Sequence, residues 1–174
     1  MAKQVLETPR LILREMSMDD LGFVAVMLAD PEVMRYYPKC YTRVEAAAWV
    51  QRSMDRYAQH GHGLWLVSDK ATGQAVGQVG LVTQTVRGLE EREVGYLIHR
   101  PYWRQGLATE AATACRDYAV QVLGSQRVIS LIRPENLPSH GVARKIGLQP
   151  EPGLVQHGMF EHIVFSSTAG RMVE

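Results

Sequence analysis

The segment EVGYLIHRPYWRQGLATEA, from Glu93 to Ala111, reads as a strand, a short turn and the beginning of a helix. Gly106 stands in the turn, after Arg104 and Gln105 and before an alanine-rich stretch. A glycine at such a turn permits a positive φ and lets another molecule approach the backbone closely. The first N–H groups of the helix and its dipole favour an anion. The segment predicts a phosphate-binding turn, although a tight connection that needs glycine only for its shape would read the same way.

The helix that follows Gly106 has a small, apolar face that ends at Gly124. The residues in register on this face are Ala108, Ala111, Ala112, Cys115, Ala119 and Val122. Helical periodicity of this kind places a face against a sheet. Cys115 is therefore expected to be a core residue rather than a nucleophile, because it lacks the basic surroundings that produce a thiolate.

Strand patterns lie on both sides of this unit. Upstream, turn signals separate three apolar runs and favour an antiparallel meander over residues 64–68, 75–86 and 92–99. Downstream, the almost continuously apolar run 127–133 is typical of a strand covered on both faces. A short helix is predicted from about Pro138 to Ile146, and the stretch GMFEHIVFSS is predicted to be a closing strand.

The N-terminal part predicts one strand and two helices. RLILR, residues 10–14, has the pattern of a short strand. Ser17 with Asp20 and Thr42 with Glu45 each form a capping-box signature ahead of apolar residues at helical spacing. The resulting order β-α-α-β-β-β-α-β-α-β predicts an α+β fold in which helices pack on a mixed, mostly antiparallel sheet. We expect a single domain over residues 1–174.

Composition excludes several classes of protein. Nineteen Lys and Arg residues against 18 Asp and Glu residues leave a formal charge of +1, so the whole chain gives no reason to expect nucleic-acid or membrane binding. The apolar patch before Arg14 is too short for a signal peptide or a membrane span. We expect a cytoplasmic protein with two reduced cysteines. No metal site is predicted, because His60 and His62 lack a third ligand at suitable spacing.

Three stretches together carry a family resemblance over nearly the whole chain. They are TPRLILREMSMDDL, the segment EVGYLIHRPYWRQGLATEA and NLPSHGVARKIGL, residues 136–148. The chain resembles the GNAT superfamily of acyl-CoA N-acyltransferases, and more narrowly its ribosomal-protein N-terminal alanine/serine acetyltransferase branch. The resemblance implies a sheet that splays at the acyl-CoA site, and an N-acetyltransferase that uses acetyl-CoA and no metal.

The resemblance also assigns residues to the cosubstrate. The glycine turn is the family's pyrophosphate loop, with the usual pattern Gln/Arg-x-x-Gly-x-Gly/Ala, although Trp103 stands at the first position here. It implies that the pyrophosphate is bound by the backbone of Arg104, Gln105, Gly106, Leu107, Ala108 and Thr109. Leu97 and Ile98 would pair with the pantetheine arm as an added strand does.

Asn136 and Ser139, at the opening of the last helix, match family positions near the pantetheine amides and the thioester sulfur. A cap-and-turn role explains these two residues equally well. The family's usual general acid is a tyrosine on the last helix, which is missing from SHGVARKIG, so Ser139 is the remaining hydrogen-bond donor for the leaving thiolate.

Glu93 is the candidate general base. On a strand its side chain shares a face with Gly95 and Leu97, and the small glycine leaves room for an amine or a water. A solvated glutamate at the start of a strand is the alternative. The resemblance implies direct acetyl transfer, with residues 34–37 and the second helix around the incoming amine.

Two kinds of function remain open from the sequence. The first is acetyl transfer to a primary amine, either a protein N-terminus or a small molecule, with a homodimer as an open assembly state. The second is a non-catalytic acyl-CoA-binding or regulatory module on the same fold. A P-loop nucleotide-binding protein is poorly supported, because the pattern G-x-x-x-x-G-K-[ST] is absent.

Overall fold

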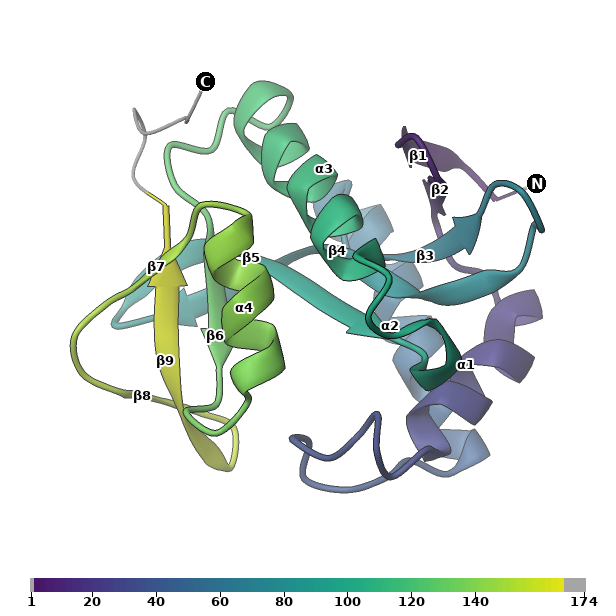
Figure 1. Ribbon diagram of the computed structural model, residues 1–174, viewed down its shortest axis with the longest axis horizontal. Coiled ribbons are helices and arrows are strands. Elements are labelled where there is room, and N and C mark those ends of the chain that lie inside the picture. The colour runs from purple at the N-terminus through teal and green to yellow at the C-terminus, as the bar shows by residue number, and fades with distance from the viewer. Residues whose placement is uncertain (1, 168–174) are drawn as a thin grey trace.

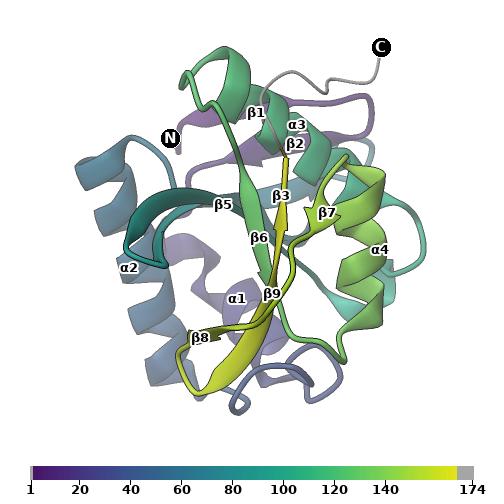
Figure 2. The ribbon, with the colours of Figure 1, turned by 90° about the vertical axis from the view of Figure 1, so that its left-hand side faces the viewer.

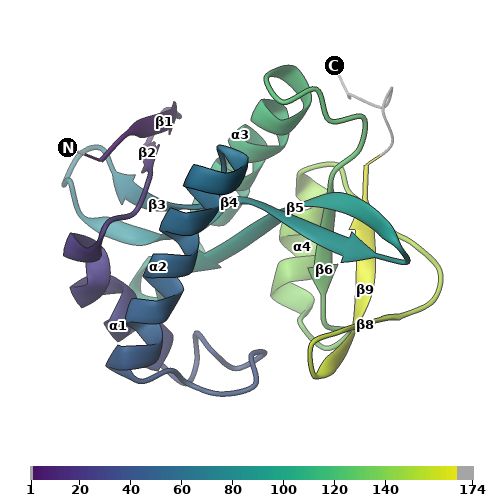
Figure 3. The same ribbon diagram turned by 180° about the vertical axis from the view of Figure 1, so that it is seen from behind.

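Helices cover both faces of one twisted sheet in the computed structural model, which describes residues 2–167. Helices α3 and α4 lie in front of the sheet in Figure 1, and Figure 3 shows α1 and α2 on the opposite face. The helices are α1 (Leu21–Ala29), α2 (Arg43–His60), α3 (Leu107–Gln121) and α4 (Leu137–Lys145). The strands are β1 (Gln4–Glu7), β2 (Leu11–Arg14), β3 (Leu64–Asp69), β4 (Ala75–Val86), β5 (Leu89–Ile98), β6 (Ile129–Ile132), β7 (Gln149–Pro150), β8 (Val155–His157) and β9 (Phe160–Ser166).

The sheet is mixed and mostly antiparallel, as the sequence predicts. Its order is β1-β2-β3-β4-β5-β6-β9-β7, with β8 paired to β9. Strands β4 and β5 pair in continuous register from Gly77 with Ile98 to Val86 with Leu89. The parallel pair β5–β6 is different, because it is registered only where Glu93 faces Ile129. Beyond that point the two strands diverge (Figure 2), so the sheet is splayed at its centre.

Both predicted capping boxes form. The Thr42 side chain accepts a hydrogen bond from the backbone of Glu45, whose carboxylate binds back to Thr42, and α2 begins there. The Ser17–Asp20 box caps a single 3₁₀ turn that leads directly into α1. These local bonds satisfy backbone N–H groups that a helix start leaves unpaired.

Two apolar clusters form the core on opposite faces of the sheet. One lies under α3 and α4 and includes Trp65 and Phe165, and the other lies under α1 and α2. The small face of α3 packs on the first cluster, where Cys115 is fully buried. Val122 was expected on this face but is 64% exposed, because α3 ends at Gln121 and its last turn leaves the sheet.

The N-terminal residues contribute one strand more than predicted. β1 pairs antiparallel with β2 and forms the edge of the sheet. Two further short strands, β7 and β8, pair with β9. No helix among residues 2–167 is both long and apolar enough to cross a membrane.

Candidate active site

The carboxylate of Glu93 occupies the point where β5 and β6 separate. Leu131 of β6 donates its backbone N–H to Glu93 Oε1 at 3.2 Å. Gln84 of β4 donates its side-chain amide to Glu93 Oε2 at 2.8 Å. The Glu93 carboxylate therefore accepts the Leu131 N–H at the place where the backbone pairing of β5 with β6 stops. The two donors hold both carboxylate oxygens in place.

Burial raises the pKa of Glu93 above its ordinary value, even though the bonds from Gln84 and Leu131 favour the charged form. Burial also raises the pKa of Tyr37 and of Tyr96, and the negative charge of Glu93 adds to both shifts. A carboxylate with a raised pKa holds a proton more readily at pH values near neutrality, which is a property of catalytic acids and bases.

The glycine turn has a special backbone conformation. Gly106 has a φ of 76° and forms the N-cap of α3 without any side-chain cap. Arg104 also has a positive φ, of 60°. The first helical bond runs from the N–H of Glu110 to the carbonyl of Gly106. Within residues 2–167, the backbone N–H groups of residues 104–109 have no protein acceptor. The turn thus presents a run of free donors at the positive end of α3.

Strand β5 has a free backbone edge on the side of the splay. The bond from the N–H of His99 to the carbonyl of Val76 directs the backbone groups of the odd-numbered residues toward β4. The even-numbered residues therefore face the splay, and Tyr96 and Ile98 lie beyond the last pairing with β6. Leu97, one of the two residues that sequence reasoning chose for pantetheine, directs its backbone groups to β4 instead.

Ile98 keeps the predicted orientation, but its carbonyl accepts a hydrogen bond from Trp103 Nε1 at 2.6 Å. Trp103 is the residue that departs from the family's usual loop pattern. Its indole joins the end of β5 to the glycine turn, so the free edge and the free N–H groups belong to one connected segment.

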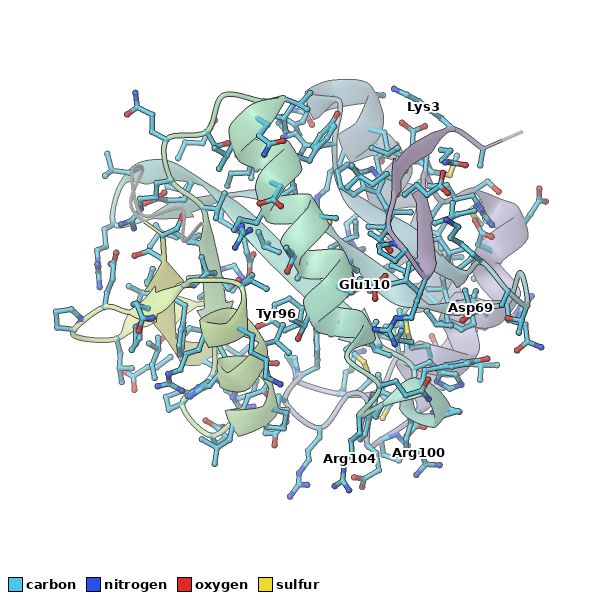
Figure 4. The ribbon with its side chains drawn as sticks, turned by 45° about the horizontal axis from the view of Figure 1, so that its top comes forward. Lys3, Asp69, Tyr96, Arg100, Arg104 and Glu110 are labelled. Atoms are coloured by element: carbon cyan, nitrogen blue, oxygen red, sulfur yellow. The ribbon has the colours of Figure 1, made fainter. Side chains whose placement is uncertain are left out.

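Asn136 and Ser139 lie together at the start of α4. The Asn136 side chain caps the helix by accepting the N–H of Ser139 at 3.3 Å, as a cap-and-turn role requires. The Ser139 carbonyl accepts a hydrogen bond from the Tyr96 hydroxyl at 2.7 Å. Figure 4 shows Tyr96 between α3 and α4. The hydroxyl of Ser139 has no hydrogen-bond partner within the described part of the chain.

Tyr96 is a candidate site residue that sequence reasoning missed. Side chains alternate along β5, so Tyr96 points to the face opposite to that of Glu93, Gly95 and Leu97. Tyr96 therefore lies on the face that α3 and α4 cover. The sequence signal was its place in EVGYLIH combined with the absence of a tyrosine from α4. Glu93 and Ser139 are not brought into contact with each other; they flank the splay from opposite faces.

Residues 34–37 and α2, which the resemblance places around the incoming amine, lie on the face of the sheet that carries Glu93. Tyr37 packs edge-on against Trp49 of α2, with ring centroids 6.3 Å apart. The Trp49 indole N–H donates to Gln78 of β4 at 3.0 Å. Met34 is buried in the same cluster, whereas Arg35 is exposed. The aromatic rings therefore border the region beside Glu93.

His60 is the last residue of α2, and His62 follows it by two positions. His62 is buried, and its Nδ1 lies 3.0 Å from the carbonyl oxygen of Leu81. His60 stacks on it at 5.9 Å. No group of three or more potential metal-ligating side chains occurs among residues 2–167.

We expect replacement of Cys115 by alanine to change stability but not catalysis. The thiol is fully buried, and burial raises its pKa, so it stays protonated and unreactive. The free energy of unfolding should fall by about 1 kcal/mol for the lost buried sulfur. Thermal unfolding and product formation per folded molecule, measured on one preparation, test this expectation. Loss of turnover in a folded Cys115→Ala protein, with acetyl trapped on the wild-type thiol, would contradict it.

Comparisons with known proteins agree with this geometry. Residues 10–149 match the family model described as acetyltransferase (GNAT) domain. The chain is 36% identical to the uncharacterized protein YkkB of Bacillus subtilis over 84% of this chain and 86% of the relative. It is 30% identical to the uncharacterized N-acetyltransferase YnaD of the same organism, over 83% of this chain and 82% of the relative.

A solved structure shares the fold. RimL, a ribosomal L7/L12 alpha-N-protein acetyltransferase solved in complex with coenzyme A, matches 95% of this chain and 98% of its own with a TM-score of 0.76. At 13% sequence identity this likeness concerns the fold alone. The splayed sheet, the glycine turn and the family match lead to one conclusion: the chain belongs to the GNAT acetyltransferases and is an acetyltransferase enzyme.

Proposed function

We propose that the protein is an acetyl-CoA-dependent N-acetyltransferase that transfers the acetyl group directly to a primary amine. The observation that carries this proposal is the run of free N–H groups at residues 104–109, placed where the free edge of β5 ends. One continuous segment therefore offers two binding features. The edge of β5 can pair with the amides of a pantetheine arm, and the turn that follows it can donate hydrogen bonds to phosphates.

The turn supports phosphate binding through its backbone. Gly106 lets the turn adopt a positive φ and leaves the backbone there without a side chain, which supports close approach of a ligand. The residues that would hold the pyrophosphate are Arg104, Gln105, Gly106, Leu107, Ala108 and Thr109. Backbone donors and the dipole of α3 favour an anion at this position without any metal.

The edge of β5 supports binding of the pantetheine arm. Tyr96 and Ile98 have the backbone groups that face the splay, so we propose them in place of the pair Leu97 and Ile98. Main-chain hydrogen bonds to an added strand-like ligand provide affinity with little dependence on the side chains. Asn136 and Ser139 lie across the splay, at the start of α4.

Acetyl-CoA supplies an activated acetyl group as a thioester, and the chain must supply proton transfer and orientation. We assign Glu93 as the group that accepts the proton of the attacking amine, directly or through a water. Its raised pKa and its fixed oxygens support this role. The free hydroxyl of Ser139 is assigned as a hydrogen-bond donor to the leaving thiolate.

The acceptor is proposed to be a protein N-terminus or a small primary amine. The name of YnaD, a relative with 30% sequence identity, favours N-acetylation. Tyr37 and Trp49 would border the incoming amine. We further propose a cytoplasmic protein that acts without nucleic acid, with a homodimer as its assembly.

The phosphate assignment predicts a large difference between two ligands. Acetyl-CoA should bind the metal-free protein at least about 100-fold more tightly than acetyl-pantetheine, because the shorter molecule makes none of the charge-assisted bonds to the turn. Isothermal calorimetry in the presence of EDTA measures both affinities. Equal affinities would refute the phosphate assignment.

The acceptor class is tested by release of free CoA with a panel of small amines and N-terminal peptides. Sustained CoA production with one amine, and acetylated product by mass spectrometry, would support the proposed reaction. Binding of acetyl-CoA with no turnover on any amine would favour a non-catalytic module.

A further inference from the structure

The carboxylate of Glu110 ties the first turn of α3 to the β1–β2 hairpin. Its Oε1 accepts hydrogen bonds from the Thr8 hydroxyl at 2.6 Å and from the backbone N–H of Arg10 at 2.9 Å. Its Oε2 pairs with Arg10 Nε at 2.6 Å. Figure 4 shows Glu110 at the start of α3, where the helix meets the hairpin. These bonds connect residues that are about 100 positions apart in the sequence.

Burial of the Glu110 carboxyl disfavours its charged form, but the bonds from Thr8 and Arg10 prevail and lower the pKa of Glu110 below its ordinary value. The group is therefore ionised throughout the neutral range, and the ion pair with Arg10 is intact wherever the enzyme would work. The contact is a fixed part of the site rather than a pH-dependent one.

The Arg10 guanidinium reaches from this ion pair to the glycine turn. Arg10 Nη1 donates to the carbonyl oxygen of Gln105 at 2.8 Å. Arg10 Nη2 lies 3.5 Å from the position that a Cβ atom on Gly106 would occupy. One side chain thus binds the first turn of α3 through Glu110 and the loop through Gln105.

The bond to Gln105 determines the direction of a neighbouring donor. The carbonyl of Gln105 and the N–H of Gly106 belong to one planar trans peptide and point in opposite directions. Holding the carbonyl toward Arg10 therefore aims the Gly106 N–H to the other side of the turn. This peptide joins Gln105 to Gly106, which has a positive φ, and Arg104, just before Gln105, also has a positive φ. A non-glycine residue keeps this conformation only where its surroundings fix it.

We propose that Arg10 is a positioning residue for cosubstrate binding, which holds the turn at residues 104–109 with its N–H groups directed at the phosphates. This inference rests on the proposed function, because it assumes that the turn binds the pyrophosphate of acetyl-CoA. Glu110 holds the Arg10 side chain, and Thr8 completes the bonds to the Glu110 carboxylate.

The test compares Arg10→Met, Arg10→Lys and a matched control, Arg14→Met. Arg14 lies at the other end of β2 and makes a two-bond ion pair with Asp20, so its loss removes a comparable contact away from the turn. Affinities for acetyl-CoA and for acetyl-pantetheine are measured by displacement of a fluorescent CoA derivative. Thermal unfolding is recorded for each variant.

We expect Arg10→Met to weaken acetyl-CoA binding by about tenfold or more, the loss typical of a charge-assisted contact, and to leave acetyl-pantetheine binding unchanged. Arg14→Met should change neither affinity. Arg10→Lys keeps a charge for Glu110 but lacks the second arm for Gln105, so it should show a smaller loss that is again confined to acetyl-CoA.

Unchanged acetyl-CoA affinity in the Arg10 variants would overturn the inference, and so would an equal loss for both ligands, which indicates a purely structural role. If Arg10→Met does not fold, Arg10→Lys decides by the same criterion. Failure of the wild-type protein to bind acetyl-CoA contradicts the proposed function itself, so the two failures are distinguishable.

Discussion

Replacement of Gly106 by valine is expected to weaken acetyl-CoA binding by about 100-fold or more while the protein remains folded. Gly106 has a φ of 76°, where a residue with a Cβ atom costs about 1–2 kcal/mol and a β-branched one is a genuine outlier. The Cβ atom of the valine would also lie 3.5 Å from Arg10 Nη2, so the larger side chain would press on the guanidinium that binds the turn. Because Gly106 is exposed and outside the apolar core, the strain should be confined to the loop.

Gly124→Val is the matched control for this substitution. Gly124 has a φ of 67°, and a side chain placed there meets no atom within 4 Å. It follows the C-terminal end of α3, whereas Gly106 precedes its first residue. The control should show a similar fall in melting temperature with normal acetyl-CoA affinity. Calorimetric binding near the wild-type value in folded Gly106→Val protein would show that the turn is only a connection.

Glu93→Gln is expected to lower turnover by about 100-fold or more, the usual contribution of a general base, with little change in acetyl-CoA affinity. Glutamine keeps the shape of the side chain and an oxygen that can accept the Leu131 N–H. It cannot accept the proton of the amine, so activity should appear only at higher pH, where more of the free amine is present. The pH dependence of kcat, measured for both proteins with a saturating amine, tests this.

Glu90→Gln is the control, since Glu90 lies exposed on the same strand. It should leave the pH profile unchanged. Wild-type turnover and an unaltered pH profile in Glu93→Gln would remove Glu93 from the mechanism.

Glu93→Gln is expected to lower turnover, but it should not lower the stability of the folded protein at alkaline pH. The pKa of Glu93 is raised in the folded protein, so the folded state favours the protonated carboxyl. Its contribution to stability is fully present below the pKa of an unfolded glutamate and is lost as the pH rises through the folded pKa. The neutral amide avoids this loss, so Glu93→Gln should be at least as stable as the wild type at alkaline pH. Chemical denaturation at several pH values measures the difference.

Sequence alone determined the elements whose signals are local. Thr42 with Glu45 set the start of α2, and the glycine turn set the start of α3 with Cys115 on the buried face. These predictions were confirmed because caps, turns and helical periodicity depend on residues within a few positions of one another. The short strand β1 was missed, because four residues become a strand only when β2 supplies hydrogen bonds.

The tertiary structure decided which distant groups meet. The Tyr96 hydroxyl and the Ser139 carbonyl are 43 positions apart, and Arg10 and Glu110 are 100 apart, so no local pattern reports either contact. Likewise, Tyr96 rather than Leu97 directs its backbone groups to the splay, because the pairing register of β4 with β5 sets which residues face outward. The N–H groups of residues 104–109 are free because of the local conformation of the glycine turn. The bond from Arg10 to the Gln105 carbonyl, in contrast, forms only when the β1–β2 hairpin packs beside α3.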